Sequence, residues 1–216
     1  MFVTGVLVIA AAVYLVPAFF TKDPFSHFQE ELPEMPSSGS VIPLEEFVNE
    51  RPRFIYEDSA EALKDYASAR SFILQGQVNS ALRKIGKIEL SNAGFEIKER
   101  ATLLREFIPV VDPAGFQDSP DMEDVFQEPY ILRGAQVVWT GQVVSVQTTA
   151  EKRQKIILSR EGPERPPFVT FDIVLEKNQF LEKGEIITVF GIFEKVLTGE
   201  LLEIKTLQIL KRNRNE

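Results

Sequence analysis

The period of the apolar positions changes along the chain. An uncharged apolar run opens the sequence, apolar residues then recur at helical intervals over residues 58–108, and alternation of period two prevails after residue 129. Because one face of a helix repeats every three to four residues and one face of a strand every two, this order predicts an α+β protein. We expect an N-terminal transmembrane helix, a short antiparallel helical unit and a C-terminal set of five strands.

The opening run is long enough to cross a membrane. Residues 2–20 contain no charged side chain, and 19 residues of helix extend about 28 Å, close to the thickness of a hydrocarbon core. We predict a transmembrane anchor at residues 1–21, which contacts the membrane through residues 2–20. The alternative is a cleaved signal peptide, since Val16 and Ala18 offer a small-residue cleavage pattern, although no Lys or Arg precedes the run.

The orientation of this anchor rests on few charges. Lys22 is the only basic residue near either end of the run, so the positive-inside rule can be applied to a single side chain. An uncharged N-terminal tail and an acidic segment after the anchor favour a body outside the cytoplasm. We predict a single-pass membrane protein with a periplasmic or otherwise extracytoplasmic body, and a cytoplasmic body is the alternative.

Two segments rich in proline or acidic residues separate the periodic regions. Residues 22–57 hold five of the 13 prolines, and residues 109–129 hold six acidic side chains and no basic one. Such compositions bury too little apolar surface to form a core. We predict a solvated spacer at 22–57 and a solvated acidic linker at 109–129, while the apolar runs 41–44 and 54–56 favour contact with a neighbouring surface.

Three helices are predicted at residues 58–108. Asp58 followed by Glu61 has capping-box spacing and marks the start of the first helix, and Gly76 marks its end. The apolar faces of the second and third helices are formed by Val78, Ala81, Leu82, Ile85 and Ile88, and by Ile97, Ala101, Leu104 and Ile108. Short turns between the three helices predict an antiparallel stack.

The first two of these helices resemble a tetratricopeptide repeat. In such repeats a glycine occupies the tight turn and a small residue lies where the helices approach most closely, and Gly76 and Ala81 fit these places. The residues that carry the resemblance are Ala69, Phe72, Gly76, Ala81, Ile85 and Ile88. Several consensus positions have no counterpart here, so a generic helical hairpin stays open. One repeat plus a helix is also too little for a concave peptide groove.

Five strands are predicted between residues 130 and 212. Their expected bounds are 137–146, 155–159, 168–175, 185–195 and 201–210. Gly141 lies inside the first strand, where a glycine is typical of a bulge or a sharp coil. Residues 197–199 predict a hairpin between the last two strands.

This region resembles the OB-fold. Five strands in about 80 residues, with a coiled first strand and a short connection at 178–183, give the outline of that barrel. Residues 181–185, Leu-Glu-Lys-Gly-Glu, followed by Ile187, Val189 and Gly191, are similar to a passage of bacterial OB-fold proteins of the tRNA-anticodon-binding-like and putative-lipoprotein kind. The resemblance implies an OB-like β-barrel at 130–212 and no particular ligand.

Little in the sequence points to catalysis. The chain has no cysteine, and its single histidine, His27, has no carboxylates at ligand spacing. No phosphate-binding glycine loop, nucleophile elbow or metalloprotease helix occurs. We therefore predict a protein that is not an enzyme, with no catalytic, cofactor-binding or metal-binding residues, no cofactor and no small-molecule substrate.

The charge of the chain argues against a general polyanion binder, because its net value is −8. An OB-fold binds single strands through stacked aromatics and a basic groove. The candidates for such contacts are Trp139, Lys155, Arg160, Arg165, Phe168 and Phe171. Trp139 and Phe171 alternate with polar neighbours, as core residues do, so nucleic-acid binding is the alternative interpretation.

The predicted membrane anchor, two folds of a kind used for interaction and the absence of catalytic motifs favour a function in protein–protein contact. We predict a non-catalytic structural or adaptor subunit of a larger envelope-associated protein assembly, with single-stranded nucleic-acid binding at the membrane as the alternative. Large aromatics on a small helical stack and the loop at 159–167 are the expected contact sites. The predicted partner-binding residues are Phe72, Phe107, Arg160, Arg165 and Phe168.

Overall fold

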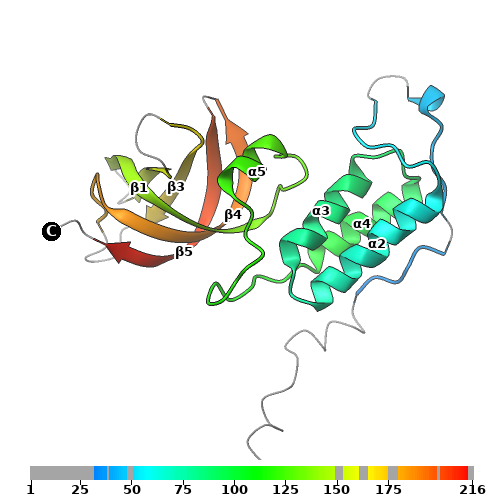
Figure 1. Ribbon diagram of the computed structural model, residues 1–216, viewed down its shortest axis with the longest axis horizontal. Coiled ribbons are helices and arrows are strands. Elements are labelled where there is room, and N and C mark those ends of the chain that lie inside the picture. The colour runs from blue at the N-terminus through cyan, green and yellow to red at the C-terminus, as the bar shows by residue number, and fades with distance from the viewer. Residues whose placement is uncertain are drawn as a thin grey trace, which may run out of the picture.

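A helical unit and a β-barrel lie side by side in the computed structural model (Figure 1). The structure describes residues 32–37, 39–47, 51–148, 153–160, 165–174, 180–198 and 200–213. No helix within these ranges is long and apolar enough to cross a membrane. The predicted anchor at residues 2–20 lies outside them, as does His27, and the anchor stays a prediction.

The α+β class is confirmed, and the helical unit consists of the three helices that the periodicity predicted. The helices described are the 3-10 helix η3 (Leu44–Glu46) and the α-helices α2 (Ser59–Leu74), α3 (Val78–Glu89), α4 (Phe95–Glu106) and α5 (Met122–Gln127). The carboxylate of Asp58 accepts a hydrogen bond from the Glu61 amide at 3.0 Å and caps α2. Gly76, at φ 72°, ends this helix, and the Gln77 amide donates to the Phe72 carbonyl. This turn folds α3 back along α2, whereas the tetratricopeptide resemblance stays a prediction.

Residues 32–57, of which 38 and 48–50 are not described, form an N-terminal strap on the helical unit. Leu32 and Tyr56 are buried in the helical core. Isolated β-bridges join Val41 to Ala93 and Phe54 to Ser91. The expectation of a solvated spacer is therefore wrong for this part, and the expected surface contact of the apolar runs 41–44 and 54–56 is confirmed by the two bridges.

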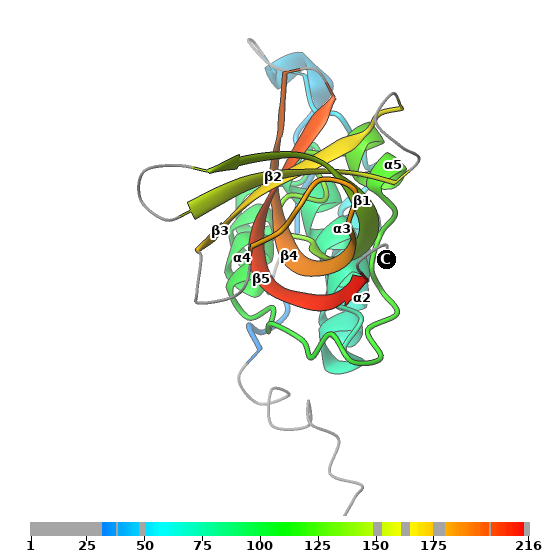
Figure 2. The ribbon, with the colours of Figure 1, turned by 90° about the vertical axis from the view of Figure 1, so that its left-hand side faces the viewer.

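The barrel has the five strands that the alternation predicted. They are β1 (Gln136–Thr148), β2 (Arg153–Ser159), β3 (Phe168–Val174), β4 (Ile186–Leu197) and β5 (Leu201–Asn213). The hydrogen-bonded order is β1-β2-β3-β5-β4, and β4 pairs with β1 to close the barrel. The β3–β5 pair is parallel and the others are antiparallel. Figure 2 shows the strands curving around the barrel interior. This closed mixed barrel is compatible with an OB-like fold.

Gly141 allows β1 to pass close to β2. A Cβ atom on this residue would lie 2.9 Å from the Ser159 carbonyl oxygen, so any side chain would push the two strands apart. The irregular register between β1 and β2 lies a little further on, between Val143 and Ser145. The coil that Gly141 predicted in the first strand is thus present, and the glycine serves the close approach.

Residues 109–129 form a junction segment between the two units. Its short helix α5 buries Met122 and Val125 in the barrel core, although three of its first four residues, counted from the cap Asp121, are acidic. The acidic side chains face outward or bind specific polar groups, while the few apolar ones pack. The expectation of a solvated linker is therefore wrong, because composition averages over these two kinds of position.

Candidate binding groove between helices and barrel

The first turn of α3 is bonded directly to the barrel. The Asn79 side-chain Nδ2 donates to the Gln136 carbonyl at 2.6 Å, and the Gln136 amide donates to Asn79 Oδ1 at 2.8 Å. Both residues are buried. The side-chain amide of Asn79 thus satisfies both backbone groups of the first residue of β1, which would otherwise be buried without partners.

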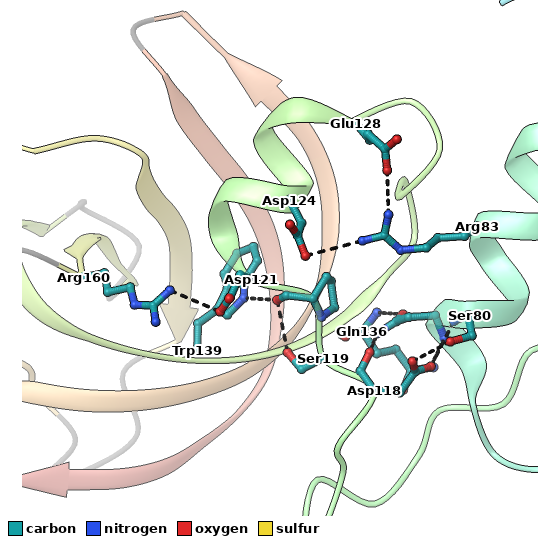
Figure 3. Close-up of polar contacts among 12 residues, drawn as sticks. Ser80, Arg83, Asp118, Ser119, Asp121, Asp124, Glu128, Gln136, Trp139 and Arg160 are labelled. Atoms are coloured by element: carbon teal, nitrogen blue, oxygen red, sulfur yellow. Dashed lines mark hydrogen bonds and ion pairs between the residues drawn. The ribbon is translucent and has the colours of Figure 1, made fainter.

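Asp118 of the junction segment caps α3. Its Oδ2 accepts from the amides of Asn79 at 2.6 Å and Ser80 at 3.0 Å, and its Oδ1 accepts from the Ser80 hydroxyl at 2.8 Å (Figure 3). The residue before the helix, Gln77, makes no side-chain cap of its own. A carboxylate at a helix N-terminus satisfies free amides and complements the helix dipole. Asp118 therefore fixes the junction segment to the helical unit.

The next residues fix the same segment to the barrel. The Ser119 hydroxyl accepts from the Val138 amide at 2.9 Å, and the Trp139 indole donates to the Pro120 carbonyl at 2.8 Å. Figure 3 shows the Trp139 contact next to the ion pair between Arg160 and Asp121, whose atoms lie 3.2 Å apart. Consecutive residues therefore bond first to α3 and then to β1.

A tight backbone contact adds to the junction. A Cβ atom on Gly86 of α3 would lie 2.8 Å from the Ile131 carbonyl oxygen, so only glycine allows the helix to approach this closely. Arg105 of α4 donates through Nη1 to the Arg133 carbonyl at 2.9 Å. Leu82 of α3 belongs to the hydrophobic core of the barrel. Apolar and polar contacts therefore both cross the junction.

A groove with a volume of about 830 Å³ lies at this junction. Its apolar lining comes from both units and from the segment between them: Leu82, Ile108, Val110, Tyr130, Ile192 and Val196. Val110 and Tyr130 are each 61% exposed. The volume is within the range of ligand-binding sites, and exposed apolar side chains around a concave surface are typical of binding sites.

The charged groups around the groove are partly neutralised. Arg105 and Glu89 form a two-bond ion pair, with distances of 2.6 and 3.2 Å. The guanidinium carbon of Arg53 lies 4.0 Å from the centroid of the Tyr130 ring. Arg133 and Glu194 are exposed, and within the described ranges neither side chain has an ion-pair partner. These two side chains are therefore free to bind a ligand.

The shifted pKa values of Asp65 and Tyr56 belong to a cluster away from the groove, where the N-terminal strap meets α2 and α3. Burial alone would raise the pKa of Asp65, but hydrogen bonds from Lys84, Lys87 and Tyr56 outweigh burial and lower it. Burial is also the main cause that raises the pKa of Tyr56, whose hydroxyl donates to Asp65. The opposite charges of Asp65, Lys84 and Lys87 neutralise one another within the helical unit, so this cluster has a structural role. Among the described residues, no three Asp, Glu or His side chains gather as metal ligands would.

The predicted partner-binding residues fall into two groups, and neither lies in the groove lining. Phe72 and Phe107 are half-buried and pack against the helical core, so they do not project as expected. Arg160, Arg165 and Phe168 gather where β2 ends and β3 begins, and the Ser159 hydroxyl donates to the Arg165 carbonyl at 3.4 Å. Arg160 and Arg165 are exposed and Phe168 is half-buried. Their role in partner binding stays a prediction.

Two aromatics considered for nucleic-acid stacking are core residues. Trp139 is 4% exposed and Phe171 is 2% exposed, and both belong to the barrel core. The core interpretation of their alternation is confirmed, so neither ring is free to stack on a base.

Few features of the sequence indicated the groove. Val110 and Tyr130 lie at or next to the ends of the acidic segment 109–129, whose composition indicated exposure to solvent. Arg133 belongs to no recognisable motif. Asn79 could have indicated the junction. It lies directly beside Val78 at the start of an apolar helix face, and a polar side chain buried at such a place requires a specific hydrogen-bond partner. Only the folded chain brings Glu194 and Val196 of β4 against these residues.

Comparison with family models, with curated proteins and with solved structures finds no match for this chain.

Proposed function

We propose that this protein is a non-catalytic adaptor subunit of a membrane-associated protein assembly, and that it binds a partner protein in the groove between its helical unit and its barrel. The membrane attachment in this proposal rests on the uncharged run at residues 2–20, and the place in a bacterial envelope rests on the charges around that run and on the OB-like resemblance.

One observation carries the proposal. The groove is built by both units, and buried bonds between Asn79 and Gln136 hold those units together. A surface formed across a fixed junction presents a single shape to a partner, which lowers the entropy lost on binding. The exposed Val110 and Tyr130 supply the apolar contact area that protein interfaces use at their centre.

The nucleic-acid alternative has less support. Of the aromatics considered for stacking, Trp139 and Phe171 are in the core, and Phe168 is half-buried. The exposed Tyr130 already has Arg53 against its ring at 4.0 Å. Base stacking requires a free aromatic face. Protein binding therefore fits the groove better.

Site-specific photo-crosslinking tests the proposal. A photoreactive phenylalanine analogue replaces Val110 or Tyr130 in the full chain, expressed in cells of its source. Phe95 of α4, which is 78% exposed and does not line the groove, is the matched control position. We expect one discrete protein adduct from positions 110 and 130 and none of that mass from position 95. Adducts with RNA alone, or the same adduct from all three positions, would contradict the proposal.

A further inference from the structure

Within the part of the chain that the structure describes, one edge of β4 has no strand partner where it passes the groove. β1 pairs with β4 from Gln142↔Ile186 to Gln136↔Ile192, and the last bonds from this side reach Phe193. Beyond that residue, the ladder partners of β4 lie in β5 alone, across the described residues. Glu194, Lys195 and Val196 nevertheless line the groove. A sheet edge of this kind presents unpaired backbone groups that match an extended polypeptide.

The unpaired edge is short and irregular. It covers residues 194–197, and the register between β4 and β5 shifts between Phe193 and Lys195. Short, bulged and charged edges resist indiscriminate strand pairing. A strand added here needs side-chain contacts of its own, so the occupant has to match the groove in shape and charge.

The net charge of the groups around the groove is positive, opposite in sign to the net charge of the whole chain. Among its lining residues Arg105, Arg133 and Lys195 stand against Glu89 and Glu194, and Arg53 lies over the adjoining Tyr130. Arg105 and Lys195 are paired, the first with Glu89 and the second with Glu203 at 3.1 Å. Arg133 and Glu194 are left without an ion-pair partner in the described ranges, and with Arg53 the charged groups at the groove sum to a positive charge, on a chain of net charge −8. An occupant that carries carboxylates complements this groove.

From these observations we propose that the groove binds an acidic, extended segment of a partner protein, which adds a short strand to the open edge of β4. An aliphatic side chain of the segment packs among Leu82, Ile108 and Val196, and a carboxylate pairs with Arg133. This inference rests on the proposed adaptor function, and it specifies the chemistry of the partner.

A peptide selection on the full chain in detergent micelles tests the inference. The probe is a phage-displayed library of random linear peptides, and enriched sequences are synthesised and their affinities measured by fluorescence polarisation. We expect enrichment of Asp or Glu together with Val, Ile or Leu at alternating positions. Methylation of alternate backbone nitrogens in one register should weaken binding by at least about tenfold, and in the other register it should have little effect, because only one set of amides faces β4.

Charge reversal on the protein provides the matched comparison. Arg133→Glu should weaken the selected peptides by about tenfold, and Lys183→Glu, at an exposed lysine in the turn before β4 that does not line the groove, should change affinity by less than about twofold. Circular dichroism and Trp139 fluorescence check that both variants fold.

Several outcomes would overturn the inference. These are basic or non-alternating selected peptides, no enrichment at all, equal effects of methylation in both registers, or a larger loss from Lys183→Glu than from Arg133→Glu. Binding of oligothymidylate that depends on Arg133, with no peptide enriched, would instead indicate a nucleic-acid groove. A protein adduct at positions 110 and 130 would still support the adaptor proposal if no peptide is selected, so the two failures are distinguishable.

Discussion

Two buried asparagines hold two different segments to the helical unit with the same chemistry. Asn92 accepts from the Tyr56 amide at 2.7 Å and donates to the Tyr56 carbonyl at 3.2 Å. Asn79 accepts from the Gln136 amide at 2.8 Å and donates to the Gln136 carbonyl at 2.6 Å. In each case a side-chain amide binds both backbone groups of one residue, as a neighbouring strand would.

The two sites differ in what they join. Asn92, between α3 and α4, fastens the N-terminal strap to the unit that the strap already covers, whereas Asn79 fastens that unit to the first strand of the barrel. The same pair of bonds is therefore local in one place and joins two units in the other. The importance of a polar contact depends on which parts of the chain it joins, and substitutions at the two sites should separate these roles.

The largest effect is expected for Asn79→Ala. This change leaves the buried backbone groups of Gln136 without their partner, so we expect the free energy of unfolding to fall by about 3 kcal/mol. Urea unfolding followed by the fluorescence of Trp139, the only tryptophan, measures it. Gln75→Ala, which removes an exposed bond from the C-cap of α2 to Ser71, is the control and should change stability by less than about 0.5 kcal/mol. A loss below about 1 kcal/mol for Asn79→Ala would show that the junction does not depend on this residue.

Asn92→Ala should cost less, about 2 kcal/mol, because the strap has a further bridge at Val41 and some solvent exposure. Amide hydrogen exchange separates the two sites. We expect faster exchange at Tyr56 and unchanged exchange at Gln136. Equally faster hydrogen exchange at both amides would mean that the strap and the barrel are coupled. The contact made by Asn92 would then not be local to the helical unit.

A third comparison lies inside the junction segment, between two aspartates. Asp118→Ala removes the cap of α3 and should lower stability by about 1 to 2 kcal/mol. Asp121→Ala removes the same charge from an exposed pair with Arg160 and should have an effect close to zero. Thermal unfolding of both variants measures the difference. Equal losses would indicate that only the net charge of the segment matters.

Among the substitutions expected to destabilise the protein, the smallest effect concerns the helical unit alone. Asp65→Asn should lower stability by about 1 kcal/mol near neutral pH, since Asp65 accepts from Lys84 at 2.7 Å and contacts Lys87 at 3.0 Å. Because the folded pKa of Asp65 lies below its unfolded value, its stabilisation is complete above the unfolded pKa and disappears as the pH falls through the folded pKa. The difference between the variant and the wild type should therefore shrink below about pH 4.

Equilibrium unfolding at a series of pH values tests this dependence. A difference that stays constant down to the lowest pH at which the chain folds would show that the Asp65 charge contributes nothing.

Periodicity predicted the helices of the helical unit and the strands of the barrel, but not the short helix α5. The faces led by Val78 and Ile97 predicted α3 and α4, and the alternation after residue 129 predicted all five strands, because burial of one face imposes a pattern on local sequence. The barrel was expected only through the OB-fold resemblance, and the order of its strands was not predicted, since the β3–β5 pairing joins residues far apart in the chain.

Composition did not predict how the segments between the elements pack. Residues 32–57 and 109–129 are acidic on average, yet Leu32, Tyr56, Met122 and Val125 are buried. A few anchoring side chains and backbone bonds fix such segments, and an average over the window hides them. The groove was missed for the same reason, because its walls meet only after the junction segment has folded.

The central claim is that the helical unit and the barrel unfold as one body because of their junction. Equilibrium unfolding of the full chain in micelles, followed in one titration by far-UV circular dichroism for the helices and by Trp139 fluorescence for the barrel, tests it most directly. We expect coincident transitions in the wild type and separated transitions in Asn79→Ala. Two separate transitions in the wild type would contradict a fixed junction, and with it the groove as a single binding surface.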